Sequence, residues 1–349
     1  MDEKKKIIDK INNDIQRINC MKKGEKRNIE IKKIMSYMSY QYQIGNIENS
    51  DYTYYVTRIN INKFFTIIQR DNKIIIKNLV DNNKLFINKY IEIINVYSNY
   101  DLDYTDNYID YHNISLAMMD FFKNIKVFDL YKHLIDNNMI GRSVRLNKKD
   151  ITIDTYGDSY IIIGNIHLNN MFYYNLFVHE MGHVYVHNIL KNKRICKDLE
   201  ISCEFVSVLF ERLFTIFLKE NSYLNLEELK KYIMNVEAKT MYSLNWAYLS
   251  NEIVKDKKYN KITNRGIIIT DNNVFSLYKN CYVIGNFISI YLLNQYNYDY
   301  LKIMNDLPNI IKSVYKMDIK ELFDNYFRID YIKEYLDFVL DNQKIKVKS

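Results

Sequence analysis

His179-Glu180-Met181-Gly182-His183 is the stretch around which the rest of this chain can be interpreted. Two imidazoles four residues apart on a helix lie one turn apart on the same face, so His179 and His183 could bind one zinc ion. Glu180 lies about 100° further round the helix, beside the metal but off the ligand line. It suits the general base that takes a proton from a zinc-bound water. The pattern also arises by chance, so the surrounding sequence has to decide.

The next predicted helix, residues 197–220, carries acids on an otherwise apolar surface. It is apolar round most of its circumference and is therefore expected to be buried. Glu204, Ser207 and Glu211 nevertheless recur on one side of it at spacings of three and four. A buried carboxylate is costly unless it is paired or bound to metal. A helical hairpin would bring Glu204 back over the imidazoles, which completes a His-His-Glu set and leaves the fourth zinc position for water.

Three further residues near this set have alternative interpretations. Glu211 either orients a ligand imidazole by accepting its second ring hydrogen or lies at the surface or in a salt bridge. Glu200, one turn before Glu204, is the rival third ligand. His187 continues the ligand face, but a straight helix cannot wrap three consecutive turns round one ion. We therefore interpret His187 as a neighbour of the site.

Composition and charge narrow the class of protein. The chain has 349 residues, of which 48% are hydrophobic and 26% charged, which is an ordinary globular composition for one large domain or two. A net charge of +7 is mild, and the lysines are spread along the chain. No nucleic-acid partner is expected. Scarce proline (1) and glycine (8) suit long helices.

The cellular location is predicted from the absence of paired cysteines, a signal peptide and a membrane-spanning segment. The four cysteines form no CxxC pair and are interpreted as free thiols in a reducing compartment. The charged N-terminus has no apolar core of a signal peptide, and no run of about 18 apolar residues occurs that could span a membrane. We therefore expect a cytoplasmic location and no membrane partner.

Periodicity predicts a mainly α fold with a few short strands. Strands are expected at 150–154 and 159–164, just before the motif helix at 171–191. Zinc peptidases commonly hold an extended peptide as an added strand at a sheet edge, and Ser159–Gly164 is the candidate edge; a purely structural hairpin is the alternative. Ile140–Ser143 is interpreted as a turn. The other expected elements are helices at 1–35 with a break near Gly24, 52–69, 74–97, 114–135, 226–237, 241–254, 272–295, 298–307, 308–315 and 319–340, and a strand at 267–270.

These residues resemble the thimet oligopeptidase and oligoendopeptidase F family of zinc metallopeptidases. The family motif HE-x-G-H, with glycine fourth, matches residues 179–183. Its second signature, Glu-x-x-Ser-x-x-x-Glu on the following helix, matches Glu204, Ser207 and Glu211. Weaker similarity continues through 278–285 and 317–327, so the resemblance covers about 140–340.

The resemblance implies a helical, bowl-like metallopeptidase domain with a small β-sheet next to the zinc-binding helix. Residues 140–349 would be the catalytic domain, and 1–139 an N-terminal helical region that forms a shortened channel wall or lid. One zinc per chain would be bound by His179, His183 and Glu204, with Glu180 as base. A tyrosine hydroxyl would hydrogen-bond the oxyanion. Tyr282 is the closer match for that role and Tyr278 the second.

The chain also departs from the family. It is much shorter than typical members, the loss falls in the N-terminal half, and residues 272–278 lack the histidine that the family carries there. The predicted function is a zinc-dependent metalloendopeptidase that hydrolyses oligopeptides. The alternatives are a catalytically degenerate member that binds a peptide or protein around a structural zinc, and a toxin-like zinc proteinase. The sequence does not indicate an oligomeric state.

Overall fold

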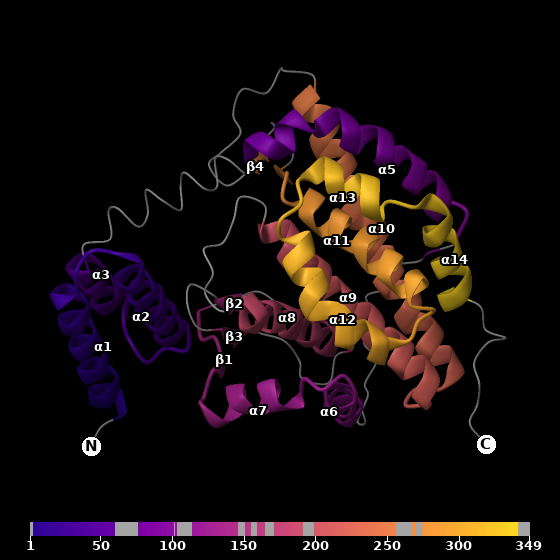
Figure 1. Cartoon of the computed structure of the whole chain (residues 1–349). Coiled ribbons are helices and arrows are strands. Elements are labelled where there is room, and N and C mark those ends of the chain that lie inside the picture. Colours follow the sequence, from indigo (N-terminus) through magenta and orange to yellow (C-terminus); the bar gives the residue numbers. More distant parts are fainter. Residues whose placement is uncertain are drawn as a thin grey trace.

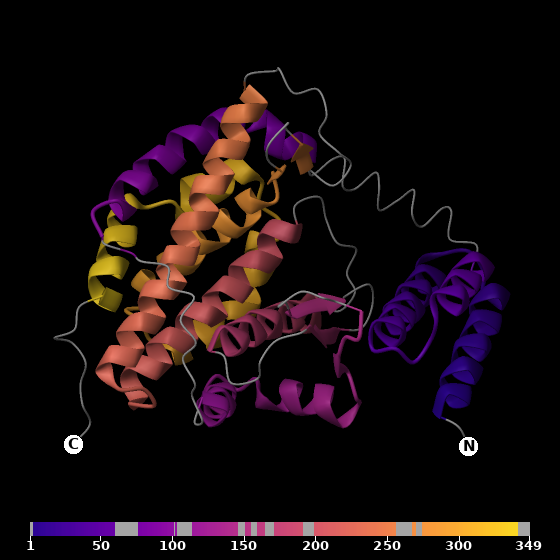
Figure 2. The same ribbon diagram turned by 180° about the vertical axis from the view of Figure 1, so that it is seen from behind.

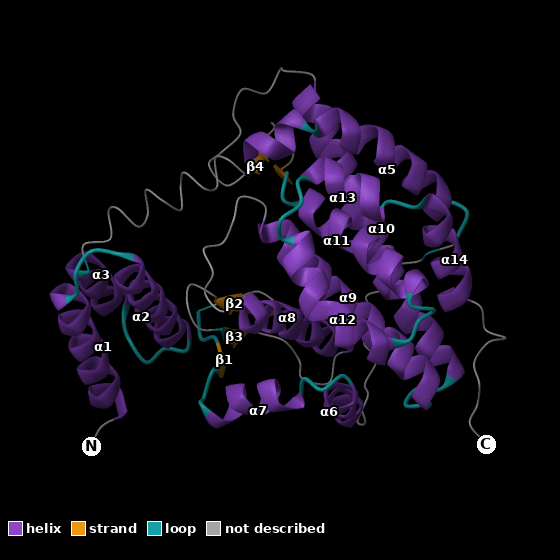
Figure 3. Cartoon of the chain, in the orientation of Figure 1, coloured by secondary structure: helices purple, strands orange, loops and turns teal. Residues whose placement is uncertain are grey.

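The expectation of a mainly α fold with few strands is confirmed (Figure 3). The computed structural model describes residues 3–59, 76–100, 102, 114–145, 151–154, 159–164, 171–190, 199–255, 267–269 and 274–340. The helices are α1 (Glu3–Cys20), α2 (Glu25–Gln43), α3 (Asn49–Arg58), α5 (Asn83–Tyr97), α6 (Ile114–Asn124), α7 (Phe128–Asp136), α8 (Met171–Leu190), α9 (Leu199–Asn221), α10 (Leu226–Lys255), α11 (Lys279–Gln295), α12 (Tyr300–Val314), α13 (Ile319–Tyr326) and α14 (Ile329–Leu340). The strands are β1 (Ile140–Arg142), β2 (Ile151–Asp154), β3 (Tyr160–Ile163), β4 (Ile267–Ile269) and β5 (Val274–Ser276).

The main core is built around α9, against which α8 and α11 both pack (Figure 1). A helix that lies between two neighbours must be apolar on both sides, which explains why α9 is apolar round most of its circumference. Its buried phenylalanines are Phe205, Phe210, Phe214 and Phe217. The helix with the histidine motif therefore packs directly against the helix with the Glu-x-x-Ser-x-x-x-Glu motif, within the main core.

The first three helices have a small core of their own. Isoleucines of α1, including Ile11 and Ile15, pack with Ile31 and Met38 of α2 and with Tyr55 of α3. In both ribbon views this three-helix unit lies to one side of the main helical body (Figures 1 and 2). Helices α5 to α7 instead contribute to the main core. A functional division at residue 139 stays a prediction.

The three-stranded sheet corrects two sequence predictions. Its order is β1-β3-β2, with β1 parallel and β2 antiparallel to β3. Ile140–Ser143 is therefore not a turn, because Ile140 to Arg142 pair with Ile161 to Ile163. Ser159–Gly164 is not a sheet edge either, since its strand β3 is the central one, with neighbours on both sides. Strand β2 is the edge that contacts α8.

Several predicted helix boundaries are also wrong. The helix expected from residue 272 begins at Lys279, because Val274 to Ser276 pair with β4. The pairs of helices expected at 226–254 and 298–315 are each one helix, α10 and α12, and Pro308 lies inside α12. The apolar face of α12 continues past Pro308, and its burial outweighs the lost backbone hydrogen bond. Conversely, the helix expected at 114–135 is interrupted at Lys126, whose φ is +58°.

The break near Gly24, the motif helix and the helix after it are confirmed as α1–α2, α8 and α9. Part of the helix expected at 52–69 lies outside the described residues, as does the last residue of the strand expected at 267–270, whose first three residues form β4. None of the described helices combines the length and apolar character needed to cross a bilayer.

Candidate metal centre

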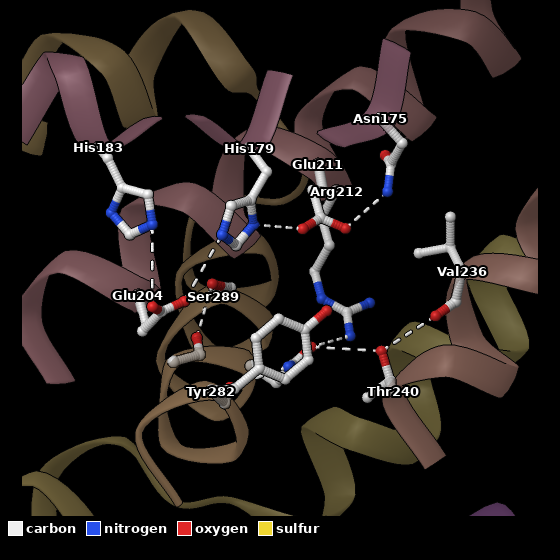
Figure 4. A network of polar contacts seen from close by, with 12 residues as sticks. Asn175, His179, His183, Glu204, Glu211, Arg212, Val236, Thr240, Tyr282 and Ser289 are labelled. Carbon is white, nitrogen blue, oxygen red and sulfur yellow. Dashed lines mark hydrogen bonds and ion pairs between the residues drawn. The ribbon is translucent and has the colours of Figure 1, made fainter. Parts of the chain in front are cut away.

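His179, His183 and Glu204 come together where α8 crosses α9 (Figure 4). One ligand atom from each of the three side chains lies within 4.8 Å of the others. The His179 Nε2 is 3.6 Å from Glu204 Oε2, and the His183 Nε2 is 3.8 Å from Glu204 Oε1. The side chains remain 11%, 13% and 27% exposed. The expected helical hairpin therefore places Glu204 opposite both imidazoles.

The donor set fits zinc. Two ligands bound to a tetrahedral zinc at about 2.1 Å lie about 3.4 Å from each other. The two histidine–carboxylate separations, 3.6 and 3.8 Å, need only small side-chain adjustments to reach that value. Two imidazole nitrogens and one carboxylate are typical of catalytic zinc sites, which keep a fourth position open. Among the described residues no other group of three histidine, cysteine or acidic side chains has this geometry.

Gly182 and Ser207 mark the point of closest approach between α8 and α9. A Cβ built on Gly182 would lie 2.5 Å from the Cα of Ser207 and 2.9 Å from its backbone nitrogen. Any side chain at position 182 would therefore push the two helices apart. This explains in physical terms why glycine falls inside the histidine motif and a small residue lies three after Glu204.

A second glycine places α11 against α9 beside the same acid. A Cβ on Gly285 would lie 2.9 Å from the nitrogen of Phe205 and 3.0 Å from the carbonyl carbon of Glu204. One turn on, the Ser289 hydroxyl donates to the Phe205 carbonyl at 2.9 Å. The backbone at Glu204 is therefore held from two sides, by α8 and by α11.

Glu211 orients His179 from behind. Its Oε1 lies 2.5 Å from the His179 Nδ1, and its Oε2 accepts from Asn175 Nδ2 at 2.7 Å. Tyr232 in turn donates to Asn175 Oδ1 at 2.8 Å. A carboxylate on Nδ1 fixes the ring tautomer, and the Nε2 of His179 is then the nitrogen on the side of Glu204. The burial of Glu211 excludes a surface position, and the contact is the one that an orienting role requires; that role stays a prediction.

Charge keeps Glu211 ionised although its side chain is buried. Burial alone would raise the pKa of Glu211, but the Lys239 charge and the hydrogen bonds from His179 and Asn175 outweigh it and lower that pKa to about 2. For His179, burial would lower the pKa, whereas the hydrogen bond and charge of Glu211, with Glu204 and Glu180, raise it to about 8. The two groups thus form a charged pair in the absence of metal.

Glu180 is buried beside the cluster and is not one of its three ligands. Burial raises the pKa of Glu180 to about 7, and the neighbouring carboxylates of Glu204 and Glu211 add to this, while His179 opposes it. A carboxyl group poised near neutrality can both accept and return a proton.

His187 is not among the clustered ligands. Burial, with the charge of Lys32 on α2, lowers the pKa of His187 to about 4. Glu200, the rival ligand, lies in α9, but its side chain is outside the described residues.

Tyr282 lies beside the cluster, with its ring centroid 6.3 Å from that of His179. Figure 4 shows its hydroxyl end directed toward Arg212 and away from Glu204. Burial raises the pKa of the Tyr282 hydroxyl well above its ordinary value; among neighbouring charges, Glu211 and Arg212 act on it more strongly than Glu204. Tyr278 is the residue that caps the start of α11, one turn before Tyr282.

A buried ion pair beneath the site was missed at the sequence level. Arg212 donates to Glu237 at 2.6 Å and to Asn286 at 2.6 Å, and both charged side chains are only 1% exposed. Tyr97 and Tyr335 donate to the two oxygens of Glu237 at 3.0 Å. The available signal was an arginine within the apolar run of the second motif helix, which requires a partner when buried.

Similarity to known proteins is found among solved structures. No protein-family model matches the sequence, and no curated protein matches it. Among solved structures, a Bacillus anthracis str. Ames protein assigned as an oligoendopeptidase F is 10% identical with a TM-score of 0.46, over 90% of this chain and 62% of that one. A PZ peptidase A with an inhibitor is 10% identical with a TM-score of 0.49, over 92% and 66%. This chain thus spans just under two thirds of the length of either structure.

Proposed function

We propose that this chain is a zinc-dependent metallopeptidase that hydrolyses peptide bonds in oligopeptides. The observation that carries the proposal is the convergence of His179, His183 and Glu204 from two helices, with Glu180 buried alongside. One zinc per chain would be held by these three ligands. When bound, it would polarise the scissile carbonyl and lower the pKa of a water molecule.

The residues of the chain would then handle the proton. Glu180, whose side chain is buried beside the three ligands, takes it from the attacking water and returns it to the leaving amine. Glu211 holds His179 in position throughout. Tyr282, with Tyr278 as the second candidate, would donate a hydrogen bond to the developing oxyanion after its hydroxyl turns toward the cluster.

Substrate would lie along the sheet. Strand β2 is an edge strand that contacts α8, and an extended peptide can pair with such an edge. The peptide backbone would then run beside the motif helix. Residues 1–139 would wall or cover this side of the site, since α2 contacts both β2 and β3.

The test is the replacement Glu180→Gln, assayed with quenched fluorescent peptides and with a chelator. The amide keeps the shape of the side chain but cannot accept the proton, so turnover should fall about a hundredfold or more. Glu252→Gln, on the half-exposed part of α10, is the matched control and should leave turnover unchanged. Chelator should abolish cleavage, and added zinc should restore it.

Two results would contradict the proposal. Undiminished turnover in the Glu180→Gln protein would rule out the mechanism. Tight binding of peptides that the unsubstituted, zinc-loaded protein never cleaves would indicate a binding module with a structural metal.

A further inference from the structure

Two lysines lie on the side of the cluster formed by α10 and α11. The Lys239 ammonium, from α10, is 6.0 Å from the ring centroid of Tyr282, and that ring also lies beside His179. Lys279 is the first residue of α11, three before Tyr282, so it shares a helix face with that ring. Lys239 is half-buried and Lys279 is exposed. A solute that reaches the cluster from this side would meet both charges.

Lys279 lies at the exposed start of the stripe of residues by which α11 meets α9. Gly285 lies against Glu204 and Phe205, and Ser289 donates to the Phe205 carbonyl. Residues 279, 282, 285 and 289 follow one another at spacings of three and four and therefore form one stripe. Burial and the Lys239 charge lower the pKa of Lys279 while Glu204 raises it, in keeping with two ammonium groups near one carboxylate.

The lysines offset part of the negative charge at the cluster. Glu180, Glu204 and Glu211 lie at or beside it, and the Lys239 charge lowers the pKa of each of these carboxyl groups. Arg212 is already paired with Glu237. Without the two lysines an anionic peptide would meet a more negative site.

We propose that Lys239 and Lys279 bind a carboxylate of the substrate, so that this enzyme prefers peptides with an acidic group close to the scissile bond. The inference rests on the proposed peptidase function, because it concerns the substrate of that activity. Its test is a binding measurement and does not require cleavage. The carboxylate has two possible sources, the free C-terminus of a short peptide or an Asp or Glu side chain. Ammonium groups from two helices can close on either one.

The experiment compares one acetylated peptide in matched charged and neutral forms. One arm changes the C-terminus from carboxylate to amide, and the other changes a single Glu to Gln beside the expected scissile bond. Binding is measured by fluorescence anisotropy to the zinc-loaded, full-length Glu180→Gln protein, and cleavage by the unsubstituted protein. The carboxylate form should bind about tenfold or more tightly than its neutral form in one arm, which identifies the source.

Lysine variants in the same background show whether these two residues carry the preference. Lys279→Gln and Lys239→Gln should each move the charged-to-neutral affinity ratio toward one, and Lys279→Arg should retain most of it. Lys231→Gln, on the exposed face of the same helix α10, should leave the ratio unchanged. Because Lys279 is exposed, its variant is expected to fold even if the Lys239 variant does not.

The outcomes separate this inference from the proposed function. Equal binding of charged and neutral forms, or a preference that survives both glutamine variants, would overturn it. A lysine-dependent preference in a protein that cleaves no peptide would support the carboxylate site while contradicting the peptidase proposal.

Discussion

Gly182 sets the distance between α8 and α9, the helices of the proposed metal site, because it has no side chain. In a helix, Gly→Ala is ordinarily favourable by roughly 1 kcal/mol. At this position the added methyl would meet the Ser207 backbone at 2.5 Å, so α8 and α9 must separate. We expect Gly182→Ala to reduce stability by about 1–3 kcal/mol. It should also weaken zinc binding about tenfold or more, since Glu204 moves away from the imidazoles.

Urea unfolding and a zinc competition titration measure the two effects. Gly24→Ala is the matched control, because a Cβ there would meet nothing within 4 Å. Unchanged zinc affinity in the Gly182→Ala protein would show that the close approach of the helices does not position the ligands.

His179 should make zinc binding depend on pH. Only the neutral imidazole binds a metal, and the pKa of His179 in the metal-free protein is raised to about 8, mainly by Glu211 against the opposing effect of burial. Zinc must therefore displace a proton below about pH 8, where affinity should fall about tenfold per pH unit. Burial lowers the pKa of His183 well below its ordinary value. That imidazole is therefore already neutral near pH 8 and does not contribute to the pH dependence of zinc affinity there.

Calorimetric titration at pH 7 in two buffers of different ionisation enthalpy counts the released protons. Glu211→Gln, which removes the charge that raises the pKa of His179, should reduce the release. A proton release of zero in the unsubstituted protein would contradict this assignment.

At the scale of the elements, the Arg212–Glu237 pair fastens α9 to α10 beneath the metal site. Tyr97 of α5 and Tyr335 of α14 also donate hydrogen bonds to the Glu237 carboxylate. Arg212→Met would leave the Glu237 charge buried and unpaired. We expect a loss of about 3–5 kcal/mol in the free energy of unfolding, as for other buried pairs that lose one partner.

Urea unfolding also measures this loss. Replacing both members of the pair by Met should cost less than Arg212→Met alone, because no orphaned charge remains. Lys231→Met, in a pair exposed on the surface of α10, is the control and should change stability little. If the double variant were as unstable as Arg212→Met, the loss of stability would come from altered packing and not from the unpaired Glu237 charge.

At the scale of the whole molecule, the proposed metal site lies on helices of the main core, whereas α1 to α3 have a separate small core. Zinc that binds only the folded state should stabilise it by about 2.7 kcal/mol when free zinc is a hundred times its Kd. Removal by chelator should therefore lower the Tm. Hydrogen exchange should slow on zinc addition mainly in α8 and α9, and less in α1 to α3.

Two histidine variants check this prediction. His183→Ala should abolish the zinc-dependent rise in Tm, while His133→Ala, on the exposed face of α7, should keep it. A rise in Tm that persists in the His183→Ala protein would place the zinc elsewhere.

The helices with strong periodicity were predictable, and the errors have physical causes. Residues 171–190 and 199–221 are helical over nearly the expected range, because long amphipathic or apolar runs without proline have few alternatives. Ile140–Arg142 is a strand only because Ile161–Ile163 lies beside it. Pairing between distant segments leaves no local trace in a run of three residues, and the same holds for Val274–Ser276.

The sequence by itself determined which atoms could hold a metal and on which helix faces they lie, because the helical period converts a spacing of four residues into one face. Only the tertiary structure decided that Glu204 meets the two imidazoles, that Glu211 lies behind His179, and that Lys239 and Arg212 surround the site. Those relations depend on how closely helices pack, and that distance depends on a contact such as Gly182 on Ser207, between residues far apart along the chain.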